Sequence, residues 1–175
     1  MAMTPGVRRL ALTAHVTSSV GWLGAVAAFL ALAVAGLTTA DALVARAAYL
    51  ATEIITWYVI VPLSLASLAT GLISSLGSVW GLLRHYWVLT KLVLTVLATT
   101  LLVVHTQPIG MVADAAATTA SLGTDLRHLQ VQLVADAAAA ALVLLVATVL
   151  AVYKPRGMTR YGQRKQYQQR SALAS

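Results

Sequence analysis

Long runs of apolar residues, separated by short polar segments, dominate the sequence. A membrane-spanning helix needs about 20 mostly apolar residues, and four runs reach that length. Backbone N–H and C=O groups must be satisfied within the segment when lipid surrounds it, so we expect helices rather than isolated strands. The pattern predicts an all-α fold, an integral membrane four-helix bundle. Its expected spans are Leu10–Leu37, Tyr49–Leu76, Tyr86–His105 and His128–Tyr153.

Two prolines modify this pattern. Pro62 lies near the middle of the second run and predicts a kink in that helix, because it lacks an N–H and clashes with the preceding turn. Pro108 follows the third run, so we expect the third span to end before it. Residues 106–126 then form a long connection on the outer side. Its alanine-rich part, 111–122, is compatible with a short helix on the outer surface or with a mobile segment that covers the bundle there.

Composition supports a membrane protein and changes the meaning of the net charge. Apolar residues make up 59% and charged residues 10% of the chain, whereas soluble domains carry about 25% charged residues. The net charge is +7, but most of it lies after the last apolar run, which favours contact with anionic lipid headgroups over nucleic acid. We expect a four-helix transmembrane domain, residues 1–155, and a basic, flexible cytoplasmic tail, residues 156–175. The chain has no cysteine, which excludes disulfides and thiolate ligands.

The distribution of Lys and Arg predicts the orientation. Cytoplasmic loops of membrane proteins carry an excess of these residues. One side of the predicted bundle holds only Arg46 and Arg127, so the opposite side is expected to be cytoplasmic, with both termini on it. The basic residues on that side are Arg8, Arg9, Arg84, Lys154, Arg156, Arg160, Arg164, Lys165 and Arg170.

Ionisable side chains inside the predicted spans are the candidate functional residues. A charge or an imidazole at membrane depth costs several kcal/mol unless it is paired, ligated or hydrated. No catalytic residue can be assigned among them from the sequence. They are His15, Glu53, Lys91, His105 and Asp136, with His128 at the start of the last span.

Helical rise separates these residues into two layers. His15 lies about 9 Å and Lys91 about 6 Å from the cytoplasmic edge, at 1.5 Å per residue. They form a candidate inner pocket if the first and third spans touch. Ser18, Ser19 and Trp22 follow His15 on the same helical face. Alternatively, Lys91 extends to the headgroups and His15 is a neutral histidine bonded to a serine.

The outer layer contains His105, His128 and Glu53. Two histidines on adjoining helices can ligate a haem iron from both sides. The same two histidines with Glu53 can instead hold copper or zinc. Gln132 and Asp136 continue a stripe from His128 at i+4 and i+8, where they can orient a ligating imidazole. A third interpretation is that both histidines are solvated at the membrane interface.

Two short motifs stand out in the first and third spans. They consist of His15, Trp22 and Gly24 in the first span and of Trp87, Lys91 and His105 in the third. These segments resemble bacterial membrane proteins of the HemJ (protoporphyrinogen oxidase) type, their uncharacterised relatives and the CopD copper-resistance group. The resemblance implies a bacterial plasma membrane, haem b within the bundle, and electron exchange with quinone or oxidation of a porphyrinogen. It implies His15 as haem ligand and Lys91 facing an acidic group of haem or substrate. The likeness to CopD favours copper.

Two classes of function follow from these features. One is a membrane haem b protein, with oxidoreductase activity left open, exchanging electrons with quinone or a small substrate such as a porphyrin. The other is a non-catalytic protein that handles or senses copper or zinc, or serves as an accessory subunit. In both, the lipid bilayer is a partner and nucleic acid is not. Small residues on the helix faces allow a homodimer.

Overall fold

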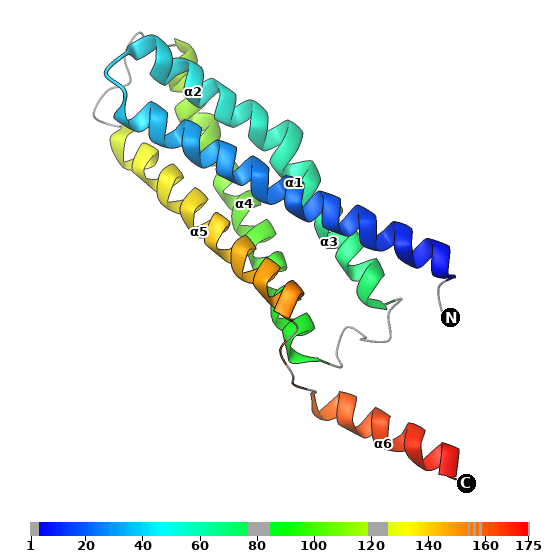
Figure 1. Cartoon of the computed structure of the whole chain (residues 1–175). Coiled ribbons are helices and arrows are strands. Elements are labelled where there is room, and N and C mark those ends of the chain that lie inside the picture. Colours follow the sequence, from blue (N-terminus) through cyan, green and yellow to red (C-terminus); the bar gives the residue numbers. More distant parts are fainter. Residues whose placement is uncertain are drawn as a thin grey trace.

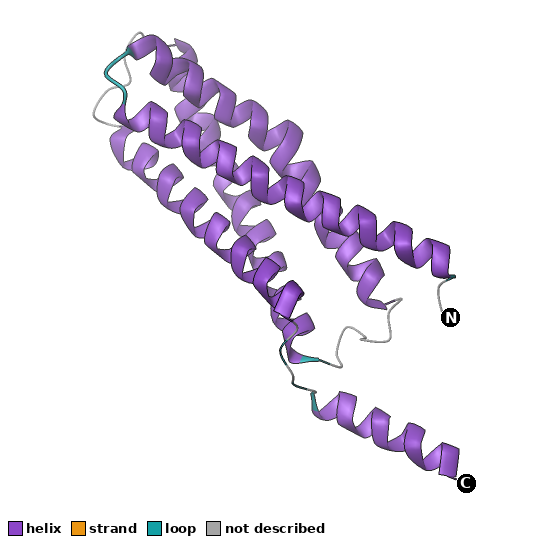
Figure 2. Ribbon diagram, viewed as in Figure 1, coloured by secondary structure: helices purple, strands orange, loops and turns teal. Residues whose placement is uncertain are grey.

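Helices form all the regular structure in the described part of the chain (Figure 2). The computed structural model describes residues 4–76, 85–118, 126–153, 155, 157 and 159–174. Four stretches in it are long and apolar enough to cross a membrane. The predicted all-α bundle of four membrane-length helices is therefore confirmed.

The bounds of these helices differ from the sequence prediction mainly at their ends. Most of the helices are longer than a hydrocarbon layer of about 30 Å requires, so their ends project beyond it. The second span is one continuous helical stretch made of three elements. In chain order the elements are α1 Pro5–Thr38, α2 Ala42–Ile55, η1 Thr56–Ile60, α3 Val61–Leu76, α4 Tyr86–Thr118, α5 Arg127–Tyr153 and α6 Arg160–Ala174.

The four spanning stretches form a bundle with four corners. α1 packs against α2 and α3 on one side and against α5 on the other, and α4 likewise contacts α2, α3 and α5. α1 and α4 therefore occupy opposite corners. Towards the end of the bundle that carries the N-terminus, α1 and α3 diverge from α4 and α5 (Figure 1). We call this the N-terminal end, and the end with the α1–α2 connection the opposite end.

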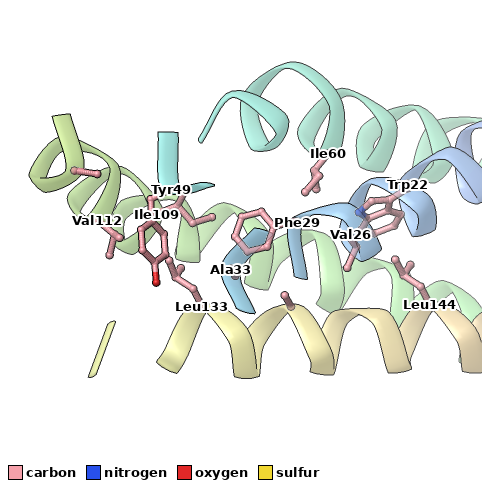
Figure 3. Packing of buried hydrophobic residues seen from close by; sticks show 12 residues of the cluster. Trp22, Val26, Phe29, Ala33, Tyr49, Ile60, Ile109, Val112, Leu133 and Leu144 are labelled. Carbon is pink, nitrogen blue, oxygen red and sulfur yellow. The ribbon is translucent and has the colours of Figure 1, made fainter. Parts of the chain in front are cut away.

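The core follows one face of α1. Trp22, Val26, Phe29 and Ala33 are buried and recur at helical spacing, so they point to the bundle axis. Figure 3 shows Trp22 and Val26 on the same side as Leu144 of α5, with Phe29 further along the axis. The opposite faces of the spans carry exposed apolar side chains, as lipid contact requires.

α1 and α2 approach each other closely at a glycine. A Cβ on Gly36 would lie 2.8 Å from Cζ of Tyr49, which is fully buried. Only a residue without a side chain permits this approach, as is common between membrane helices. The contact holds the start of α2 against the end of α1.

The predicted end of the third span before Pro108 is wrong. α4 continues through Pro108 to Thr118 and reaches about 50 Å at 1.5 Å per residue. Its extension buries Ile109, Val112, Ala113 and Ala116, and α4 packs against α2. This packing compensates for the backbone hydrogen bond that the proline removes. The expected short surface helix over 111–122 is thus the last part of α4 as far as residue 118; residues 119–122 lie outside the described ones.

Pro62 is accommodated by a change of helix type. The π-helical turn η1, Thr56–Ile60, directly precedes it, and the N–H of Val61 bonds to Thr56 O. A π turn widens the helix by one residue and relieves the clash between a proline and the preceding turn. The second span therefore stays helical from Ala42 to Leu76.

Part of the basic tail is helical. Arg160–Ala174 forms the helix α6. Its Gln, Arg, Lys and Ala residues are good helix formers, and no proline interrupts them. Figure 1 shows α6 projecting away from the bundle beyond the N-terminal end.

Candidate functional site

His15 lies in a polar pocket between α1 and α3. Its Nδ1 is 3.1 Å from the backbone oxygen of Ser67 and 3.4 Å from Oγ1 of Thr70. A carbonyl oxygen only accepts, so Nδ1 carries the proton and donates it to Ser67. In the neutral ring, Nε2 then has a free lone pair. The imidazole is thus fixed in one tautomer, as in many metal-ligating histidines.

A glycine makes room for this ring. A Cβ on Gly71 would lie 2.9 Å from Cε1 and 3.2 Å from Nδ1 of His15. Next to it, the hydroxyls of Ser19 and Ser67 are 2.7 Å apart and link the two helices. The backbone of α3, and not its side chains alone, therefore determines where the His15 ring lies.

Lys91 of α4 faces the same cavity. His15 and Lys91 both line a small cavity of about 20 Å³, together with Ser67, Gly71 and Thr95. The ammonium of Lys91 also lies 5.9 Å from the centre of the Trp87 ring, within the range of a cation–π contact. The structure thus brings the two residues of the predicted inner layer to one cavity. They meet beside α3, which packs against both α1 and α4.

A second polar pair joins α4 to α5, and both of its side chains are partly exposed. Nε2 of His105 is 3.3 Å from Oδ2 of Asp136, and Nδ1 of His105 is 2.8 Å from the backbone oxygen of Leu101. Sequence reasoning missed this pair because it ended the third span at His105. Since α4 continues past Pro108, His105 lies inside a helix and faces α5 two turns from its start. The sequence did contain a sign of the longer helix: apolar residues, among them Ile109, Val112 and Ala116, continue at helical spacing after Pro108.

The other predicted outer residues are not gathered around His105. His128 is exposed near the start of α5 and lies about 12 Å along the helix from Asp136. Glu53 and Gln132 are partly buried. Both ring nitrogens of His105 face oxygen atoms of the protein, so neither presents a free lone pair to an iron shared with His128. Within the described ranges, no group of three His, Asp or Glu side chains is arranged to hold a metal ion.

The fold defines the chain as a multi-pass helical membrane protein with two groups of polar side chains, one around His15 at the N-terminal end and one between α4 and α5. Comparison of the chain with protein-family models, curated proteins and solved structures finds no match.

Proposed function

We propose that the protein is a haem b-binding redox protein of the bacterial plasma membrane, in which His15 would hold the haem iron. The observation that carries the proposal is the state of the His15 ring. Its Nδ1 donates to Ser67 O, which leaves the lone pair of Nε2 for a metal. The resemblance of the segments around His15 and Lys91 to HemJ-type and CopD-type proteins supports the same assignment.

The donor set suits a haem. An imidazole is the commonest protein ligand of haem iron, and Lys91 on the same cavity provides a positive charge for a propionate. The cavity of about 20 Å³ is much smaller than a porphyrin. Binding of haem here would therefore require α3 and α4 to separate further, and these helices already diverge at this end (Figure 1).

When bound, haem supplies one-electron exchange with quinone or a small substrate such as a porphyrinogen. The role of the chain is to hold and orient the group. Ser67 sets the tautomer of His15, Gly71 leaves space for its ring, and the apolar walls Leu68 and Leu92 exclude water. We place the His15 pocket on the cytoplasmic side, because the basic residues gather at that end.

The test is the absorption spectrum of protein purified in detergent after expression with excess haem. We expect a Soret band in the wild type and its loss in His15→Ala. His128→Ala is the matched control, because that histidine is exposed and distant from the pocket, and it should keep the band. Lys91→Met should retain haem but bind it more weakly, by roughly tenfold for the loss of one favourable charge contact.

A colourless wild-type protein, or a Soret band unchanged in His15→Ala and lost in His105→Ala, contradicts the assignment. Metal analysis of a colourless preparation then examines the second class of function, a non-catalytic protein that handles copper or zinc.

A further inference from the structure

The outward face of the second span carries polar and aromatic side chains in the middle of the membrane-length stretch. Glu53 and Ile54 of α2 lie next to Trp57 and Tyr58 of η1, because residues four apart share a helical face. Ile54, Trp57 and Tyr58 are exposed, Tyr58 by 78%, and Glu53 is partly exposed. We call these four residues the η1 patch.

The π-helical turn shapes this patch. Thr56 and Ile60, at its two ends, are buried and point to the bundle axis. The three residues between them, Trp57, Tyr58 and Val59, are all exposed. A π turn holds one residue more than an α-helical turn and occurs frequently at functional sites. The widened turn thus presents two large aromatic side chains side by side on the outside of the bundle.

The η1 patch lies within the hydrocarbon layer and not at its edge. α1 runs antiparallel to the second span, and the contact of Gly36 with Tyr49 sets their register. Tyr58 is nine residues beyond this contact, which puts it level with residue 27 of α1. The apolar run of α1 is bounded by Arg9 and Asp41, so its middle is residue 25. Tyr58 therefore lies about 3 Å from the middle of a layer that extends about 15 Å to each side.

The polar groups of the patch need partners at this depth. By the same register, Glu53 lies about 10 Å from the middle of the layer. Within the described part of the chain, neither the carboxyl of Glu53 nor the hydroxyl of Tyr58 takes part in a hydrogen bond or an ion pair. Lipid tails provide no donor or acceptor, and ionisable residues within spans almost always face protein. Tyr and Trp are also enriched at protein interfaces. The η1 patch is therefore suited to contact with another protein surface.

A second copy of the chain complements the η1 patch. Both copies insert in the same orientation, so a two-fold axis along the membrane normal brings each level of one patch to the same level of the other. Side chains of a helix lean towards its N-terminus, so the hydroxyl of Tyr58 reaches the level of Glu53. It can donate to a carboxyl oxygen of the partner's Glu53, which accepts in either protonation state. The axis repeats this contact, so both copies are satisfied.

We propose that the protein forms a homodimer in the membrane through the η1 patch, with Ile54 and Trp57 packed in the contact and Tyr58 bonded to the partner's Glu53. A partner of different sequence would need a donor and an acceptor at these same two levels, which the chain itself already carries. The patch shares no residue with the His15 pocket. The dimer is consequently independent of the function proposed above.

Disulfide cross-linking in membranes tests where the contact lies. The wild type has no cysteine, so each single-cysteine variant reports on one position. Ile54→Cys places a thiol in the η1 patch. Leu142→Cys is the matched control, because Leu142 is similarly exposed on α5. With a membrane-soluble oxidant such as iodine, Ile54→Cys should form a covalent dimer and Leu142→Cys should remain monomeric. Any result in which Ile54→Cys does not exceed Leu142→Cys overturns the proposal.

Dilution of the full-length protein in lipid vesicles tests the hydrogen bonds. Subunit counting by photobleaching measures the dimer fraction as the ratio of protein to lipid falls. Tyr58→Phe removes only the two hydroxyls of the interface and should weaken the dimer roughly tenfold, the value of two interhelical hydrogen bonds in a membrane. Tyr153→Phe should have no effect, because that exposed side chain ends α5 outside the patch.

Substitution of the acceptor separates its charge from its hydrogen bond. Glu53→Gln should keep the dimer, because the amide oxygen also accepts, whereas Glu53→Ala should weaken it as much as Tyr58→Phe. A wild type that stays monomeric at high protein density, or a Tyr58→Phe variant that dimerises like Tyr153→Phe, contradicts the proposed contact. Circular dichroism checks that each variant is folded, and cross-linking of Ile54→Cys tests the contact without altering either polar group.

Discussion

At the scale of single residues, the environment of His15 is more specific than its position in an apolar run suggests. α3 contacts the ring through the carbonyl of Ser67, the hydroxyl of Thr70 and the bare backbone at Gly71. These contacts fix the tautomer, the plane and the depth of the imidazole together. A functional histidine needs this control, whereas a histidine that merely fills space does not.

Gly71→Ala should disturb this site without changing any polar group. Its new Cβ would lie 2.9 Å from Cε1 of His15, and such overpacking typically costs about 1–3 kcal/mol. We expect a lower midpoint of thermal unfolding in detergent and, if haem is bound, an altered Soret band.

Gly24→Ala is the matched control for that substitution. It also lies in a membrane helix, but nothing stands within 4 Å of its added Cβ. This variant should be neutral, or more stable by up to about 1 kcal/mol from helix propensity. If the two variants melt alike, close contact at Gly71 does not position His15.

At the scale of helices, α4 shows how packing overrides a local signal. A proline normally ends or kinks a helix, at a cost of about 3 kcal/mol in its interior. Here the residues after Pro108 bury a regular apolar face and continue the helix to Thr118. Arg46 of α2 donates to the carbonyl of Ala117, 2.6 Å away, and so satisfies one of the last free acceptors of α4.

Pro108→Ala should therefore stabilise the protein rather than disrupt it. Alanine restores an N–H that can donate to the carbonyl of Val104, one turn earlier. The gain should be about 1 kcal/mol, the net value of one backbone hydrogen bond. Thermal unfolding followed by circular dichroism measures it, and a lower melting midpoint would show that the proline itself has a structural role in α4.

At the scale of the whole molecule, the four spans alternate in direction, so the N-terminus and the end of α5 lie at one end of the bundle (Figure 1). The bias of Lys and Arg predicts that this end faces the cytoplasm. In that orientation the His15 pocket lies on the cytoplasmic side, and the stripe from His128 to Asp136 begins on the outer side.

Cysteine labelling tests this orientation directly, because the wild-type chain contains no cysteine and provides an unlabelled background. Ala40 lies exposed between α1 and α2, and Ser171 lies exposed on α6. A membrane-impermeant maleimide should label Ala40→Cys in intact cells, and Ser171→Cys only after lysis. The reverse pattern would invert the orientation and assign each site to the other side.

Much of the molecule was predictable because lipid imposes strong constraints on sequence. Run length and apolarity predicted four spans, since any break in such a helix exposes unsatisfied backbone. The residues of the inner pocket were also predictable, because helical rise places His15 and Lys91 at similar depth. The contribution of Gly71 was not, because it depends on how close α3 comes to α1.

The sequence by itself thus determined that the protein is a bundle of four membrane-length helices and that His15 and Lys91 lie at a similar level along it. Tertiary structure alone decided that α4 passes Pro108, that His105 pairs with Asp136 rather than with His128, and that a cavity lies beside this pair. The physical reason is that depth follows from position along one helix. Pairing instead depends on which faces of neighbouring helices meet, and contacts distant in sequence set that choice.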